Sequence, residues 1–422
     1  MEYIFFCVFL LLLCRVITKV PFVKNAGLDN RTVVLLFLLK VIAGLAIGWI
    51  TVSFFDIRND YWNMNEDAWK EYQLLLHHPR EYFMNITETH YAKGYAGFFD
   101  ALPSYWNDLR NTIISKLLAP FNLLSRGNYY INSLFFNFFC FMGHIAFYRI
   151  FIQLYADRKT AVIICCFLLP SMLYFTSGIQ KDGIVFSVLG VLCYTVFKAL
   201  QEGRFTAKRT GVVFFSLLLL FFIRSYVPIL ITPALLIWIA VVKYKLPPLV
   251  SFTAGYILAA VLFFNLEQLT GNFNPLEAVT KKQEAFFMLP KAATEIKLDT
   301  LYPNFKSFAH NVPQAFNHSL LRPYLTELPS KSILPLNIET LLYLLAFLLF
   351  LFFRYNPDAG LKNPFTCFGV FFSMSMLLFI GYIVPNLGSI VRYRSIYLIF
   401  LVTPIFCGLD LKKVLRALKI KK

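Results

Sequence analysis

Residues 161–199 read AVIICCFLLPSMLYFTSGIQKDGIVFSVLGVLCYTVFKA, and this pattern decides the class of the protein. Two apolar runs, 161–177 and 183–199, each approach the length of about 20 residues that crosses the hydrocarbon core of a bilayer. Lys181 and Asp182 stand between the runs, where there is no room for a long loop. A charged side chain deep in a bilayer costs about 2.5–3.5 kcal/mol. The pattern therefore predicts a helical hairpin in a membrane with two charges at its tip.

The composition of the whole chain agrees with this class. Apolar residues make up 58% of the 422 residues and charged residues only 15%, whereas soluble domains average about 45–50% and about 25%. Neither a Walker sequence nor a G-x-G-x-x-G motif is present. The eight cysteines all lie in apolar runs, which argues against a disulfide framework or a zinc site. These observations exclude soluble nucleotide-binding enzymes.

Eleven apolar runs are predicted to span the membrane, so that residues 1–422 form one all-α, polytopic transmembrane domain. The N-terminal run lacks a positively charged start and a small-residue cleavage site, so we interpret it as a retained span. The predicted spans lie at 3–19, 33–55, 131–150, 161–177, 183–199, 211–224, 227–242, 248–266, 338–353, 365–384 and 391–408.

The distribution of basic residues predicts the orientation. With the N-terminus outside, the inner loops and the basic tail 409–422 hold 21 Lys and Arg against 5 Asp and Glu. This bias fits the positive-inside rule. It also explains the net charge of +17 without a nucleic-acid partner. We expect a bacterial cytoplasmic membrane, with two long outer loops at 56–130 and 267–337.

The first outer loop carries a group of carboxylates soon after the second span. Residues 67–76 are predicted to form a short amphipathic helix, capped by Asn65 or Asp67 and ended by Pro79. A carboxylate here either stabilises the start of the helix or acts in chemistry at the membrane surface. The carboxylates belong to Asp56, Asp60, Glu66 and Asp67.

A second short apolar segment in this loop, 112–124, is too short to span a bilayer. It is predicted to be a helix that lies on the membrane. An ordinary packed loop helix is an equally good interpretation.

Several cations also fall on the face predicted to be outside. Arginine side chains suit phosphate oxygens, and two nearby arginines make a good anion site. The alternative is that they anchor helix ends, although basic anchors usually lie on the inner face. These cations are Lys181, Arg224, Arg322, Arg392 and Arg394.

No cofactor is predicted. His77 and His78 are adjacent and so point in different directions on a helix, and with His90 they form no ligand set with motif spacing. A divalent metal is left open without support from the sequence.

Carboxylates, cations and surface helices on one face fit a specific reaction. A carboxylate can act as general base on an acceptor hydroxyl, and cations can stabilise a departing phosphate. A groove open to lipid can hold a polyprenyl tail. The inventory therefore predicts transfer of a sugar from a polyprenyl-phosphate donor to a glycan or lipid acceptor, with inversion at the anomeric carbon.

Three short motifs resemble the GT-C superfamily of integral membrane glycosyltransferases. NEDAWKEY resembles the acidic pair and tyrosine of its first outer loop, which implies Asp67 as base with Glu66 beside it and Tyr72 in support. PSMLYFTSGIQKDG resembles a pattern of envelope-polysaccharide members, which implies that Lys181, beside Asp182, holds donor phosphate. RYRS resembles the terminal phosphate motif, which implies Arg392, Tyr393 and Arg394. The acidic pair lies some ten residues beyond the span, so Asp56 or Asp60 remains an alternative base.

Two other classes of function remain open. A polysaccharide polymerase or ligase would share the donor, but its key polar loop usually lies late in the chain. A transporter of lipid-linked glycans or small molecules would place charges near the midplane in broken helices, often with internal repeats.

Overall fold

A computed structural model shows the fold of this chain. It describes residues 2–54, 59–87, 104–271, 273–292, 294–327, 334–355 and 360–417. Within these ranges the regular secondary structure is helical, and isolated β-bridges pair Glu295 with Asn386 and Arg354 with Leu409. The prediction of an all-α protein is confirmed.

Seven helices within the described ranges are long and apolar enough to cross a membrane. Two bent helix pairs raise this number to nine if each pair is one span. The fold is therefore compatible with a polytopic membrane protein, and the total of eleven spans stays a prediction. The seven helices are α3 (Asn30–Phe54), α8 (Tyr129–Leu154), α11 (Lys181–Gln201), α13 (Tyr226–Tyr244), α14 (Pro248–Thr270), α17 (Leu334–Phe352) and α18 (Pro364–Ile383).

The other four predicted spans are also helical. Ala156–Leu168 and α10 (Pro170–Ser177) meet at a bend of 42°, and α19 (Leu387–Ser395) and α20 (Ile399–Gly408) meet at 66°. Pro170 explains the first bend because proline cannot donate a backbone hydrogen bond to the preceding turn. The remaining two helices are α1 (Glu2–Lys19) and α12 (Ala207–Ile223).

The chain divides into two compact units. The first contains Met1–Leu154, Cys166–Val196 and Thr206–Ser225. The second contains Tyr155–Cys165, Phe197–Phe205 and Tyr226–Lys422.

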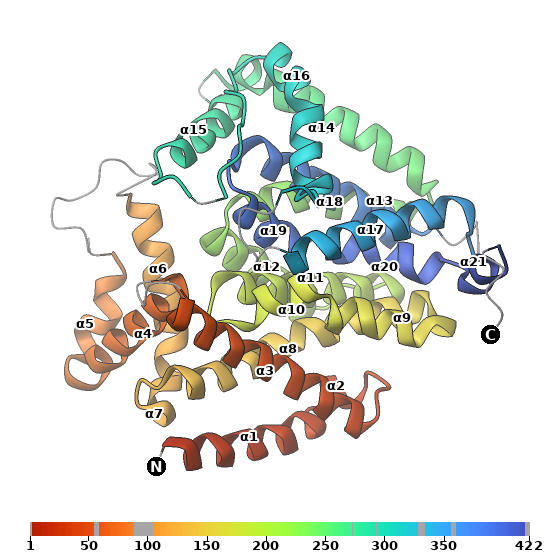
Figure 1. Cartoon of the computed structure of the whole chain (residues 1–422). Helices are drawn as coiled ribbons and strands as arrows, with labels where there is room; N and C mark the ends of the chain where they lie inside the picture. The colour runs from red at the N-terminus through yellow and green to blue at the C-terminus, as the bar shows by residue number, and fades with distance from the viewer. Residues whose placement is uncertain are drawn as a thin grey trace. The chain divides into compact units, whose positions relative to one another are not determined.

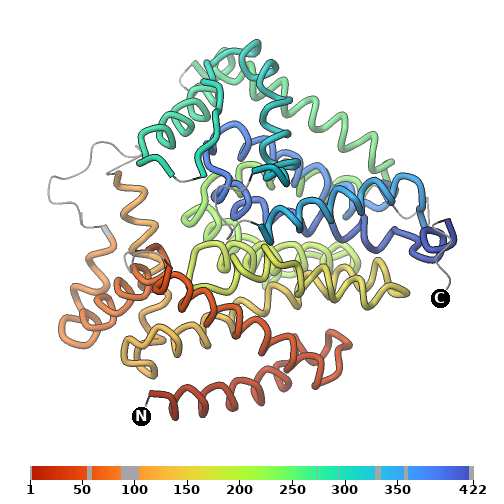
Figure 2. Tube along the Cα trace, viewed as in Figure 1, coloured from red at the N-terminus to blue at the C-terminus, as the bar shows by residue number. Residues whose placement is uncertain are grey.

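In the first unit, α1, α3 and α8 pack against one another, and α10 packs against both α3 and α8. Three helices of the first loop gather beside them, on the left of Figure 1. These are α4 (Asp60–His77), α5 (Pro79–Met84) and α6 (Tyr105–Leu118), and α4 packs along α6. Figure 2 shows the same arrangement in the orange part of the trace.

In the second unit, α18 is the central helix and contacts α13, α14 and α20. Two shorter helices, α15 (Pro275–Phe287) and α16 (Phe305–Phe316), also pack on α18. Gly381 permits the close approach of α16, because a Cβ at this position would lie 2.0 Å from the carbonyl oxygen of Ala315.

The helix predicted at 67–76 is part of α4, which begins at Asp60, about two turns before the predicted start. The predicted caps at Asn65 and Asp67 are wrong: Asn59 is the N-cap, and its side chain accepts hydrogen bonds from the backbone N–H groups of Tyr61 and Trp62. The helix ends at His77, and Pro79 starts α5. Proline fits the first position of a helix because its missing N–H would have no partner there.

The segment predicted as one helix at 112–124 is divided. Helix α6 covers its first half and ends at Leu118, and a 3₁₀ turn leads into the short α7 (Asn122–Ser125). Its position on a membrane surface stays a prediction.

Candidate functional site

The first unit brings several predicted site residues to one turn, residues 178–182, which comprises the three residues after α10 and the first two residues of α11. Gly178 packs directly against Tyr61 of α4, since a Cβ at this glycine would lie 2.4 Å from the Tyr61 ring. The amide nitrogen of Gln180 approaches Oδ2 of Asp60 at 3.5 Å. Nζ of Lys181 donates to Oδ1 of Asn111 on α6 at 2.8 Å. The turn therefore meets both α4 and α6.

Asp60 is the first residue of α4 and is exposed to solvent. The free N–H groups of a helix start and the partial positive charge there favour a carboxylate. Asp60 is therefore accessible from solvent and lies at a helix start, where a negative charge is favoured.

Buried asparagines hold α4 in place. Nδ2 of Asn65 donates to the carbonyl oxygen of Gly127 at 3.0 Å. Nδ2 of Asn132, on α8, donates to Oδ1 of Asn65 and to Oδ1 of Asn122, both at 2.8 Å. This network fixes the helix that carries Asp60 against the start of α8.

Glu66 and Asp67 lie on the solvent side of the same helix. Their carboxylates pair with Lys70 at 3.0 Å and 3.4 Å, and all three side chains are at least half exposed. The hydrogen bond to Glu66 raises the pKa of Lys70. Tyr72 packs its ring 5.6 Å from the ring of Trp69. Seven residues, or about 10 Å of helix, separate Asp67 from Asp60.

Asp182 and Arg224 form an ion pair inside the first unit. Nη2 of Arg224 donates to Oδ1 of Asp182, and the side chains are 7% and 0% exposed, respectively. The pair joins the first turn of α11 to the residue after α12. Both were predicted to bind substrate, and in this structure they contact each other. Asp56, the fourth predicted carboxylate, lies outside the described residues.

An apolar cavity of about 710 Å³ runs along α11, and its lining on this helix begins at Ile184, two residues after Asp182. Four helices of the first unit line it: α6, α8, α11 and α12. Leu118 lies on the helix that carries Asn111, and Ile184 follows Lys181 by one turn. The lining residues include Leu118, Phe139, Ile184, Val188, Phe215 and Leu219. Its volume falls within the range of ligand sites, about 300–1,000 Å³.

Sequence reasoning missed a buried carboxylate on α4. Oε2 of Glu71 accepts from Nζ of Lys116, on α6, at 2.7 Å, and its Oε1 accepts from Asn85 at 3.3 Å. The Lys116 ammonium also lies 3.8 Å from the centre of the Tyr82 ring. Tyr61, Asn65, Ala68 and Glu71 form the buried face of α4. Their spacing of three to four residues is helical, so the burial of Glu71 could have been predicted from this periodicity.

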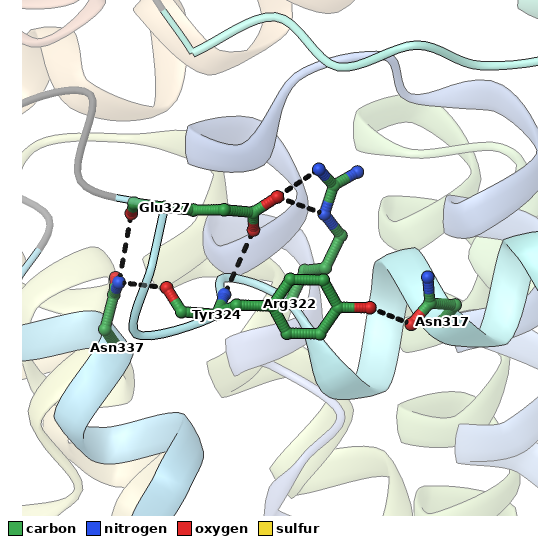
Figure 3. Close-up of polar contacts among 5 residues, drawn as sticks. All are labelled: Asn317, Arg322, Tyr324, Glu327 and Asn337. Atoms are coloured by element: carbon green, nitrogen blue, oxygen red, sulfur yellow. Dashed lines mark hydrogen bonds and ion pairs between the residues drawn. The ribbon is translucent and has the colours of Figure 1, made fainter.

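In the second unit, Arg322 belongs to a closed polar cluster (Figure 3). Its Nε donates to Oε1 of Glu327 at 2.8 Å, and Oε2 of Glu327 accepts from the backbone N–H of Tyr324 at 3.0 Å. Nδ2 of Asn337 donates to the carbonyl oxygens of Tyr324 and Glu327. Tyr324 also donates to Asn317. Although burial raises the pKa of Glu327, the hydrogen bonds from Arg322 and Tyr324 lower it overall.

Arg394 is buried and bonded to protein. Nη1 donates to the carbonyl oxygens of Ser319, at 3.1 Å, and Arg322, and Nη2 donates to Oγ1 of Thr340 at 2.6 Å. The side chain therefore fixes the segment around Arg322 against α17. Arg392 and Tyr393 are half-buried on α19, and the Arg392 guanidinium lies 5.7 Å from the centre of the Tyr393 ring.

No group of three His, Cys, Asp or Glu side chains in the described ranges is arranged to hold a metal ion. No protein-family model, no curated protein and no solved structure matches this chain.

Proposed function

We propose that this chain is an inverting membrane glycosyltransferase of the GT-C kind, which moves a sugar from a polyprenyl-phosphate donor to a glycan or lipid acceptor. One observation carries the proposal. The exposed carboxylate of Asp60 lies against the turn that presents Lys181, and the lining of an apolar cavity begins at Ile184, one turn farther along α11.

The contacts of the two carboxylates favour Asp60 over Asp67 as the proposed base. The Asp60 carboxylate takes the proton of the acceptor hydroxyl, and the oxygen attacks the anomeric carbon. The bond from that carbon to the phosphate oxygen breaks, and the phosphate leaves with the electron pair. Lys181 stabilises its charge. Asp67 is paired with Lys70 on the solvent side of α4, away from the 178–182 turn.

The cavity supplies the place for the lipid. Its lining is almost entirely apolar, and it follows α11 from Ile184 to Val191. Each methylene buried there contributes about 0.8 kcal/mol. A donor whose phosphate lies at Lys181 would extend its chain along this helix.

The arginines of the second unit do not all have the phosphate-binding role that was predicted for them. Arg322 and Arg394 are bonded to protein groups, which favours a role as anchors. Arg392 and Tyr393 remain proposed contacts for phosphate.

The test is mass spectrometry of envelope glycans and lipid-linked intermediates in cells that carry the wild type, a deletion or single variants. We expect Asp60→Asn and the deletion to lose one defined sugar, and Asp67→Asn to retain it. A normal glycan in Asp60→Asn would remove Asp60 from the reaction. Single unjoined repeats would identify a polymerase or ligase.

A transporter is the second candidate, and one observation favours it. The bent span that ends in α10 has a buried lysine, Lys40, beside it, and transporters often combine broken helices with buried charges. Complete intermediates trapped on the inner side of the membrane in the deletion strain would support transport and contradict transfer.

A further inference from the structure

Lys40 lies in the middle of α3 and is only 2% exposed. An ionisable residue inside a membrane span is costly and usually has a function. The Lys40 ammonium has three acceptors: the carbonyl oxygen of Thr176 at 2.9 Å, Oγ1 of Thr176 at 3.0 Å and Oγ of Ser177 at 3.2 Å. An ammonium has three protons to donate, so all of them find acceptors at the end of α10.

The end of α10 requires such donors. The helix stops at Ser177 inside the first unit, and the last carbonyls of a helix have no partner within it. Lys40 donates to the carbonyl of Thr176, and Nδ2 of Asn137 donates to the carbonyl of Ser177 at 2.8 Å. A cation is also favoured at the negative end of the helix dipole. Side chains from α3 and α8 therefore replace the missing backbone donors.

The start of α10 is supported in the same way. Pro170 has no N–H to donate to the carbonyl four residues earlier, which is that of Cys166. Nδ1 of His144 lies 2.7 Å from this carbonyl oxygen, and its Nε2 lies 3.2 Å from Oγ1 of Thr176. The carbonyl oxygen of Cys166 can only accept, so the proton of His144 lies on Nδ1. The hydroxyl of Thr176 then donates to Nε2 of His144 and accepts from Lys40. The network holds both ends of a helix of eight residues.

The 178–182 turn follows this helix end directly. Gly178 is the next residue after Ser177, and it packs on Tyr61, the neighbour of Asp60. Gln180 reaches Asp60, and Lys181 reaches Asn111. Any displacement of Ser177 would move the turn relative to α4 and α6.

We infer that Lys40 is a positioning residue, which fixes the end of α10 and thereby holds Lys181 at the site for donor phosphate. The part of this inference that concerns donor phosphate rests on the proposed function. The part that concerns the position of the turn does not.

The experiment compares full-length Lys40→Met with the wild type in lipid nanodiscs. Hydrogen–deuterium exchange reports the order of residues 178–182, and kinetics with geranyl phosphate-linked sugar report the KM of the donor. Thr51→Val is the matched control, because Thr51 is buried on the same helix and its hydroxyl bonds only to the carbonyls of Ile47 and Gly48. Ser177→Ala, which removes one acceptor of Lys40, is a milder second variant.

We expect Lys40→Met to speed exchange at 178–182 and to raise the donor KM by about tenfold, the effect of one lost hydrogen bond to a charged group. Ser177→Ala should do the same to a smaller extent, and Thr51→Val should do neither. A purely structural role would lower the amount of active enzyme and leave the donor KM unchanged.

Exchange in Lys40→Met equal to that in Thr51→Val would overturn the inference, whatever the activity. If Lys40→Met does not fold, unchanged exchange in Ser177→Ala would overturn it as well. A wild type without transferase activity would contradict the proposed function alone, and faster exchange at 178–182 in the variants would still support the positioning of the turn by Lys40.

Discussion

Arg224 donates through Nη2 to Oδ1 of Asp182, and this contact joins the first turn of α11 to the residue after α12. Asp182 is fully buried. A buried charge without a partner strongly destabilises the fold. A buried ion pair, by contrast, contributes little more to stability than apolar residues of similar volume would. The pair therefore specifies how α11 and α12 fit together.

Arg224→Met tests this role. The substitution removes the guanidinium from the buried Asp182 carboxylate, so we expect the free energy of unfolding to fall by about 3–5 kcal/mol. The double variant Arg224→Met, Asp182→Leu should recover most of this loss. Thermal unfolding in detergent measures both. A double variant no more stable than the single one would show that the ion pair does not account for the loss.

The pair of Glu71 and Lys116 connects α4 to α6, and both side chains are only 12% exposed. We expect Lys116→Met to lower the free energy of unfolding by about 1–3 kcal/mol, since it leaves a buried carboxylate with a weaker partner. Limited proteolysis should then cut more rapidly between the two helices.

Lys70→Met is the control on the same helix. Lys70 is 64% exposed, and its pairs with Glu66 and Asp67 should contribute at most about 1 kcal/mol. Equal sensitivity of the two variants to protease would contradict a special role for the buried pair.

The helices were largely predictable from the sequence because run length and hydropathy are local properties. All eleven predicted spans contain a helix. The start of α4 was not predictable, because several residues before it could act as a cap. Asn59 is the one whose side chain reaches the N–H groups of Tyr61 and Trp62, and the local sequence does not distinguish it from the other candidates.

The site was predictable only in its residue types. The sequence singled out Lys181, Asp182 and Arg224 as unusual charges, but not that Asp182 and Arg224 contact each other across 42 positions. Lys40 shows the same limit. A charge within the run 33–55 was visible in the sequence, yet its acceptors lie 136 and 137 positions away, and local patterns carry no information on such contacts.

The cluster around Glu327 should respond to pH. The pKa of Glu327 is lowered in the folded protein, where Arg322 and Tyr324 donate to the carboxylate. Its stabilising contribution is therefore present above the unfolded pKa of about 4.3 and is lost as the pH falls through the lower folded value. We expect the melting temperature of the wild type to exceed that of Glu327→Gln at pH 7 and the difference to shrink towards pH 3. A difference that does not depend on pH would show that the carboxylate charge plays no part.

The cavity can be narrowed at one position without disturbing its walls. Gly211 lines it on α12, and a Cβ added there would meet no atom within 4 Å. Gly211→Leu should therefore fold normally, since leucine favours a helix over glycine, and its side chain should occupy space proposed for the donor lipid. Excluding about two methylenes from the cavity costs about 1.6 kcal/mol, so we expect the KM for a long-chain donor to rise about tenfold.

The KM for a geranyl donor should change less, and Gly211→Ala, which adds only one methyl group, should change neither. Equal effects of Gly211→Leu on both donors would mean that the chain lies elsewhere, because only a chain that reaches Gly211 can respond to the side chain there.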